Sequence, residues 1–78
     1  MSDAQDDRRV DYVRQIGQQV RARREATGLS QTGLERAAEL RPTTVIDLER
    51  GEGDLDVHDL YRLAGVLGVY IRDLLPAT

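Results

Sequence analysis

Few side chains in this sequence could act as a nucleophile, a general base or a metal ligand. The chain has no cysteine, its one histidine is His58, and its only serines are Ser2 and Ser30. A nucleophile paired with a base, or a zinc site, needs more of these groups than the sequence supplies. The sequence therefore predicts a protein that is not an enzyme, with no metal site and no cofactor.

Arginine side chains are the groups of this sequence best suited to bind a ligand. All eleven basic residues are arginines, and nine of them lie between Arg8 and Arg50. Six acidic residues share that interval, which gives it a formal charge of +3, whereas the whole chain carries −3. Guanidinium groups can bind phosphates through two parallel hydrogen bonds, so the arginines suit phosphate contacts, but an all-arginine composition fits codon bias in the genome equally well. The overall charge argues mildly against a nucleic acid.

Hydrophobic residues recur at spacings of three and four, which predicts helices, and no segment is a good candidate for a strand. We expect a compact all-α domain over residues 7–78, preceded by a disordered tail at residues 1–6. Five helices are expected, at residues 7–27, 31–39, 42–49, 57–67 and 69–75. No run of about 18 apolar residues is present, so no membrane span is predicted.

The stretch from Ser30 to Gly51 contains two of these helices and a short corner. Ser30 has the side chain of an N-cap. Pro42 suits the first position of a helix, because the N–H that proline lacks would be unpaired there. Gly51 is a suitable left-handed terminator. Two helices of about two turns each are too small to bury a core, so the other helices must act as their scaffold.

The first expected helix contains an arginine that continues its apolar stripe. Val13, Ile16 and Val20 recur at helical spacing, and Arg24 lies one turn beyond Val20. A buried arginine without a partner is very costly. Arg24 is therefore expected to pair with an acidic residue elsewhere in the fold.

The chain resembles the Cro/C1-type (Xre-like) helix-turn-helix domain of phage repressors. The resemblance rests on Leu34 and on the segments IGQQVRARREATGLSQ, TTVIDLERG, LYRLAGVLGV and IRDLLP, and it covers residues 16–75. It implies a five-helix lambda-repressor-like fold and a sequence-specific transcription regulator that binds double-stranded DNA as a homodimer. It also implies a cytoplasmic protein of a bacterium or phage, associated with the nucleoid.

The resemblance also implies roles for individual residues. The third helix would enter the major groove. The implied base contacts are Pro42, Thr43, Ile46 and Asp47, and the implied phosphate contacts are Gln31, Arg41 and Arg50. The implied partner of Arg24 is Glu49, at the end of the third helix. The implied dimer interface consists of Tyr70, Ile71, Leu74 and Leu75.

The sequence departs from the family pattern at the corner and in the loop after the third helix. Glu35 and Glu39 stand where a small residue and a glycine are usual. The loop carries three acidic residues where basic or polar ones usually meet the DNA backbone: Glu52, Asp54 and Asp56. An alternative therefore stays open, a protein-interaction module that keeps the fold, binds a protein partner and has lost DNA binding. The acidic loop and the apolar Ile46 favour it.

Overall fold

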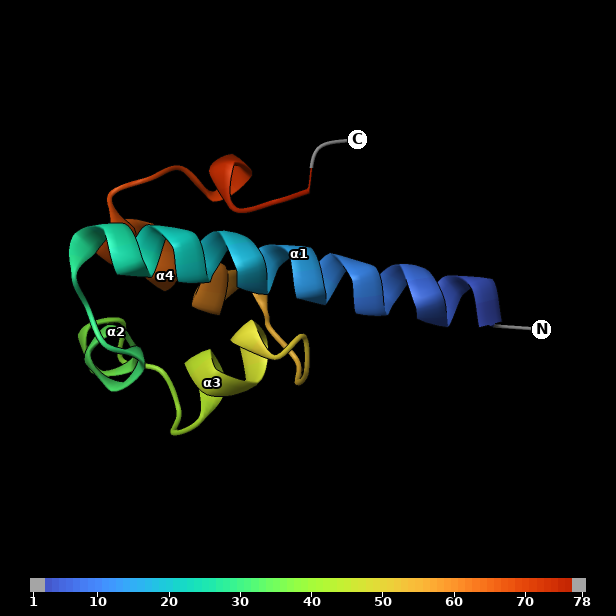
Figure 1. Cartoon of the computed structure of the whole chain (residues 1–78), viewed down its shortest axis with the longest axis horizontal. Coiled ribbons are helices and arrows are strands. Elements are labelled where there is room, and N and C mark those ends of the chain that lie inside the picture. The colour runs from blue at the N-terminus through green and yellow to red at the C-terminus, as the bar shows by residue number, and fades with distance from the viewer. Residues whose placement is uncertain (1–2, 77–78) are drawn as a thin grey trace.

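The computed structural model describes the backbone of residues 3–76 and the side chains of residues 11–76. The α-helices are α1 (Asp3–Thr27), α2 (Gln31–Ala37), α3 (Thr44–Glu49) and α4 (Val57–Leu67), and a 3₁₀ helix, η1, is Ile71–Asp73. In Figure 1, α2 and α3 lie on one side of the long α1 and η1 lies on the other. The all-α prediction is confirmed for this part of the chain, which contains no strand and no helix long and apolar enough to cross a membrane.

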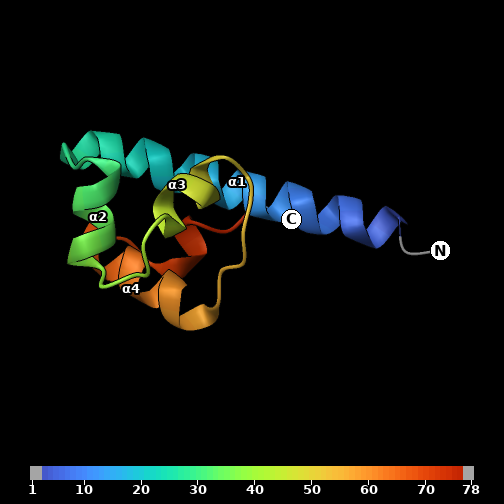
Figure 2. The ribbon, with the colours of Figure 1, turned by 90° about the horizontal axis from the view of Figure 1, so that it is seen from below.

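Helix α1 is longer than the sequence predicted. It starts at Asp3 rather than Asp7, so residues 3–6 of the expected tail are helical, and residues 1 and 2 lie outside the described residues. Its N-terminal part extends beyond the other helices (Figures 1 and 2). Among the residues of α1 whose side chains the structure describes, Val13, Ile16 and Val20 pack on the core, so this part of the helix acts as scaffold.

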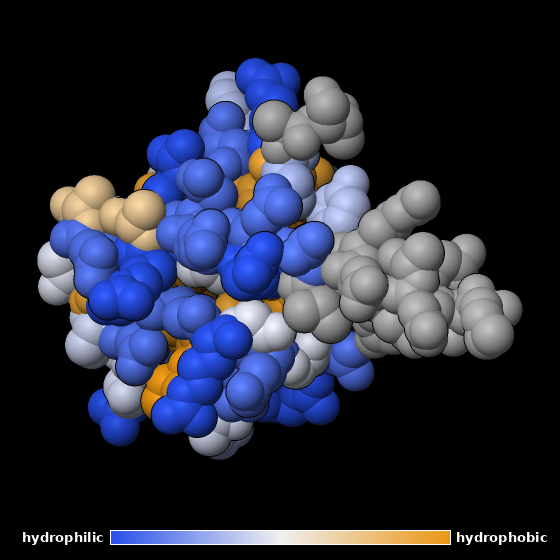
Figure 3. All heavy atoms as spheres, turned by 45° about the vertical axis from the view of Figure 1, so that its right-hand side comes forward, coloured by the Kyte–Doolittle hydropathy of each residue, from blue (hydrophilic) through white to orange (hydrophobic). Residues whose placement is uncertain are grey.

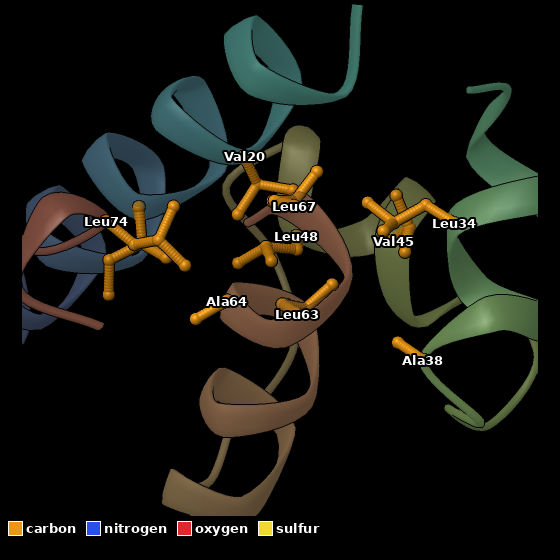
Figure 4. Packing of buried hydrophobic residues seen from close by; sticks show 10 residues of the cluster. Val20, Leu34, Ala38, Val45, Leu48, Leu63, Ala64, Leu67 and Leu74 are labelled. Atoms are coloured by element: carbon orange, nitrogen blue, oxygen red, sulfur yellow. The ribbon is translucent and has the colours of Figure 1, made fainter. Parts of the chain in front are cut away.

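The apolar stripes of the helices meet in one core. On the face seen in Figure 3, polar side chains surround only small hydrophobic areas, whereas Figure 4 shows hydrophobic side chains from all four α-helices gathered inside. Complete burial of one such side chain stabilises a protein by about 1.5–3 kcal/mol. The buried cluster consists of Ile16, Val20, Leu34, Ala38, Val45, Leu48, Leu63, Ala64, Leu67 and Leu74.

The fifth helix expected at residues 69–75 is wrong, because a single 3₁₀ turn stands in its place. Gly68 ends α4 in the left-handed conformation, with φ 73°. Tyr70 is extended, and its backbone N–H donates to the Asp73 carboxylate at 2.9 Å. Leu74 follows η1 and is 0% exposed. This segment therefore packs on the core through the buried Leu74 and the partly buried Val69 and Ile71, and it adds no further α-helix.

The corner between α2 and α3 is longer than predicted. Helix α2 ends two residues early, at Ala37, and α3 begins two residues late, at Thr44. Pro42 lies in a β-turn in which the Thr44 N–H donates to the Arg41 carbonyl at 3.2 Å. The fixed φ of proline suits this turn as well as a helix start, so the sequence pattern was ambiguous. Thr43 completes a type II turn with φ 68° and ψ 0°, which a β-branched residue rarely adopts.

Candidate nucleic-acid interface

A buried ion pair fixes the C-terminal end of α3 to α1. Arg24 Nε donates to Glu49 Oε2 at 2.7 Å, and Nη2 donates to Oε1 at 3.0 Å. The two side chains are only 12% and 5% exposed. Arg24 Nη1 also donates to the Leu29 carbonyl at 2.9 Å, and Gln31 Nε2 donates to Glu49 Oε1 at 3.0 Å. The structure thus joins the two residues that the family resemblance pairs and adds Gln31 to them.

These contacts shift the pKa values of both charged groups. The hydrogen bonds to Glu49 raise the pKa of Arg24 above its ordinary value, although burial opposes them. Burial by itself raises the pKa of the Glu49 carboxyl. The hydrogen bonds from Arg24 and Gln31, with the positive charges of Arg24 and Arg21, outweigh burial and lower that pKa. Both groups therefore remain charged at neutral pH.

A glycine that sequence reasoning missed provides the second anchor of α3. A Cβ atom on Gly17 would collide with the carbonyl oxygen of Leu48 and would lie 3.2 Å from the Cα of Glu49. Only glycine lets the backbones of α1 and α3 approach this closely. The sequence did contain a sign of this contact. Gly17 lies next to Ile16 inside a predicted helix, and a glycine inside a helix often marks a close packing contact.

The two departures at the corner both have structural partners. Glu35 Oε1 accepts from the Val45 N–H at 3.3 Å, at the end of α3 where Thr43 makes no side-chain cap. A carboxylate is favourable there because of the free N–H groups and the helix dipole. Glu39 is left-handed, with φ 55°, and its carbonyl accepts from Arg62 Nη1 at 3.2 Å. Side chains of α2 and α4 therefore hold a corner that lacks the usual glycine.

The residues expected to contact bases lie around the outer side of α3 at its N-terminal end. Pro42 and Thr43 are exposed, while Ile46 and Asp47 are half-buried. Thr43 Oγ1 donates to Asp47 Oδ2 at 3.1 Å, which orients the carboxylate and leaves it free to accept further hydrogen bonds. Helix α3 contains no basic residue. Its outer face therefore presents acceptors and apolar groups.

The residues expected to contact phosphates lie on two sides of α3. Arg41 lines a surface groove of about 320 Å³ between α3 and the following loop. Gln31 and Arg50 line a second groove of about 370 Å³, between α3 and α1, together with Arg21. Arg41 and Arg50 are exposed, whereas the Gln31 amide already donates to Glu49. The structure thus places Gln31 beside Arg50 and separates both from Arg41.

The residues expected in a dimer interface divide between the surface and the core. Tyr70 is 69% exposed and Leu75 is 40% exposed, whereas Leu74 is 0% exposed and Ile71 is half-buried. Leu74 is a core residue and cannot face a second copy, which corrects that part of the prediction. The reason is that one 3₁₀ turn, rather than a helix, sets the direction of these side chains. Another exposed aromatic residue, Tyr61 of α4, was not on the expected list.

The remaining candidate residues have local roles. Ser30 Oγ accepts from the Gly33 N–H at 2.9 Å and caps α2, and Asp56 accepts from the Asp59 N–H at 2.8 Å and caps α4. His58 is exposed in the first turn of α4. In the part of the chain that the structure describes, no three side chains of metal-binding type come together.

A family model described as helix-turn-helix matches residues 20–74, the segment that carries α2, α3, α4 and the Arg24–Glu49 pair. The chain belongs to the Cro/C1-type helix-turn-helix family. The resemblance inferred from the sequence is therefore confirmed. No curated protein sequence matches the chain.

Several solved structures are similar to this family member. The restriction-modification controller protein C.AhdI from Aeromonas hydrophila has a TM-score of 0.75 and 32% identity, over 80% of this chain and 94% of that one. The BldD DNA-binding domain from S. venezulae has a TM-score of 0.71 and 37% identity, over 85% and 99%. Apo-HppE has a TM-score of 0.74 and 32% identity over 83% of this chain, but the match spans only 36% of HppE.

Proposed function

We propose that this Cro/C1-type protein is a sequence-specific transcription regulator that binds double-stranded DNA with α3 in the major groove. The observation that carries the proposal is the uncovered outer face of α3, on a helix fixed to α1 by the buried Arg24–Glu49 pair. A recognition helix needs both a free contact face and a fixed orientation. Two similar structures, named a controller protein and a DNA-binding domain, support the same role. The proposed role is not enzymatic, needs no cofactor and belongs in the cytoplasm, at a bacterial nucleoid.

The outer face of α3 has the chemistry to select bases. The Asp47 carboxylate, oriented by Thr43, can accept a hydrogen bond from cytosine N4. Ile46 can pack against the methyl group of thymine, and Pro42 adds an exposed apolar group beside it. The half-site is therefore expected to present a cytosine to Asp47 and a thymine to Ile46.

Phosphate contacts position such a helix without adding sequence preference. Arg41 and Arg50 are exposed on either side of α3 and are free to meet the DNA backbone. The Gln31 amide has two N–H groups, of which one donates to Glu49 and the other remains available. These residues supply the electrostatic part of the affinity, which salt weakens.

A homodimer is part of the proposal, because one domain of this size contacts little DNA and a pair can bind two half-sites. Tyr70 and Leu75 are the exposed residues of the expected interface, and Tyr61 is a further exposed aromatic residue. Sedimentation velocity tests this part. The wild type is expected to sediment as a dimer and Tyr70→Ser to shift toward monomer, while a monomeric wild type at all concentrations contradicts it.

Fluorescence anisotropy with a short labelled duplex of mixed sequence, over a series of salt concentrations, tests the DNA-binding function. Binding is expected to weaken with salt, and Arg41→Ala and Arg50→Ala should each weaken it further. Arg36→Ala is the matched control, because Arg36 is exposed on α2 and lines neither groove. Absence of binding at low salt and high protein concentration would contradict the proposal.

A protein-interaction module is the second candidate, because the groove on the loop side is acidic and Ile46 is an apolar group on an otherwise polar helix face. That module would keep the fold and have no affinity for DNA. The same anisotropy experiment separates the two functions, since only a DNA-binding protein shows affinity that falls with salt.

A further inference from the structure

Two surface grooves flank the outer face of α3, and they carry opposite charge. The groove on the loop side is lined by one basic residue, Arg41, and by three acidic ones, Asp47, Glu52 and Asp54. The groove on the α1 side is lined by three arginines and one acidic residue: Arg21, Arg24, Arg50 and Glu49. The formal charges of the two linings are therefore −2 and +2.

Within the α1-side groove, some charged side chains are buried in an ion pair and others are exposed and can bind a ligand. Arg24 and Glu49 neutralise each other through two short hydrogen bonds and are almost entirely buried. The remaining positive charge of the lining comes from Arg21 and Arg50, both of which are exposed, and Arg21 is paired only with Glu25, which lies outside the lining. Ile46, from the face expected to contact bases, is part of the same lining. A ligand that touches Ile46 therefore lies next to two available guanidinium groups.

Arg21 can exchange its present partner at little cost. Its Nε atom is 3.4 Å from Glu25 Oε2, and the two side chains are 63% and 56% exposed. Exposed ion pairs of this kind contribute about 0–1 kcal/mol. A phosphate, which accepts bidentate hydrogen bonds from a guanidinium group, would replace this contact readily.

We infer that Arg21 is a DNA-contacting residue, which binds a backbone phosphate in the α1-side groove together with Arg50. The inference rests on the proposed function, since it assumes α3 in the major groove. A helix in that groove has one DNA strand on each side. The strand on the α1 side meets Arg21 and Arg50, whereas the strand on the loop side meets only Arg41, in a groove of net negative charge. Backbone binding is therefore stronger on the α1 side, which explains how an acidic loop and DNA binding occur in one protein.

The experiment is anisotropy of the full chain with a short labelled duplex of mixed sequence, as a function of salt. Arg21→Ala is expected to weaken binding to all duplexes alike and to make the slope of log affinity against log salt less steep by about 1. Arg36→Ala, which removes an exposed arginine outside both grooves, should leave the slope unchanged. Arg21→Lys should retain most of the slope, because the charge is kept.

The outcomes separate the two proposals. A wild type that binds DNA, with an Arg21→Ala slope equal to that of the wild type, overturns the role of Arg21 and leaves the proposed function standing. A wild type without affinity for DNA overturns both. Circular dichroism of each variant tests whether unfolding causes the change in binding. The fold is expected to be unchanged in the Arg21 variants, because Arg21 is exposed and outside the core.

Discussion

The two ends of α3 are held in different ways. At the C-terminal end, Glu49 is 5% exposed and accepts from Arg24 and Gln31, and Gly17 brings the α1 backbone into contact. At the N-terminal end, one long hydrogen bond to Glu35 caps the helix, and Thr43 stands at φ 68°. The close polar contacts are thus concentrated at one end and the groups expected to contact bases at the other. Backbone strain is often found at binding positions because the surrounding structure supports it.

The two ends are expected to differ most in how much stability is lost when the carboxylate that holds each end is removed. Glu49→Ala should reduce the free energy of unfolding by about 3–5 kcal/mol, because it leaves the Arg24 guanidinium buried without its partner. Glu35→Ala removes one weaker bond and should cost about 1 kcal/mol. Urea denaturation at neutral pH measures both. Equal losses in the two variants would contradict the difference between the ends.

The next effect concerns the close approach of α1 to α3. Gly17→Ala should destabilise the protein by about 1–3 kcal/mol, because the new methyl group meets the Leu48 carbonyl and backbones must shift. Gly65→Ala is the control, since nothing lies within 4 Å of an added Cβ on this exposed residue of α4. It should raise stability by about 0.5–1 kcal/mol. A melting temperature that rises in the Gly17→Ala variant as it does in Gly65→Ala would show that α1 and α3 can move apart without cost.

The pH dependence of stability provides a further test of the C-terminal end. The pKa of Glu49 is lower in the folded protein than its ordinary value, which is about 4.3. Its contribution is therefore fully present above that ordinary pKa and is lost as pH falls through the lower folded value. The stability difference between the wild type and Glu49→Gln should accordingly shrink in acid. A stability difference that is constant from neutral pH into acid would mean that the pKa of Glu49 is the same in the folded and unfolded states.

The smallest effect is expected at the corner, where it should be favourable. Glu39→Gly relieves the strain of the left-handed backbone, which costs about 1–2 kcal/mol for an ordinary residue. Glycine also makes the unfolded chain more flexible, which costs about 0.5–1 kcal/mol on folding. A net gain of about 0.5–1 kcal/mol follows. The matched change Gln19→Gly, on an exposed position inside α1, should instead lose about 1 kcal/mol. A loss in both variants would mean that the left-handed conformation costs Glu39 less than the added flexibility of glycine.

Periodicity and capping chemistry predicted most of the fold. Val20, Leu34, Val45 and Leu48 have the spacing of helical stripes and are buried as expected. Ser30 caps α2 as expected, because its preference is local. Pro42 and the segment 69–75 misled the prediction, since proline suits two backbone contexts and a short apolar segment can pack as a turn.

The site was only partly predictable, because much of it depends on tertiary contacts. The pairing of Arg24 with Glu49 came from the family resemblance, and only the need for a partner came from the residues. Glu35 was recognised only as a departure from the family pattern, and the structure shows that its carboxylate reaches the N-terminus of α3. The burial of Leu74 and the groove beside Arg21 depend on how separate elements pack, which spacing along one chain does not encode.

The most direct test of the DNA-binding account is an NMR titration of the ¹⁵N-labelled protein with a short duplex. The largest amide shifts are expected in residues 41–47, at the start of α2, and around Arg21 and Arg50, while the exposed face of α4 around Tyr61 changes little. Shifts centred on α4 and η1, or no shifts at duplex excess and low salt, would contradict the account.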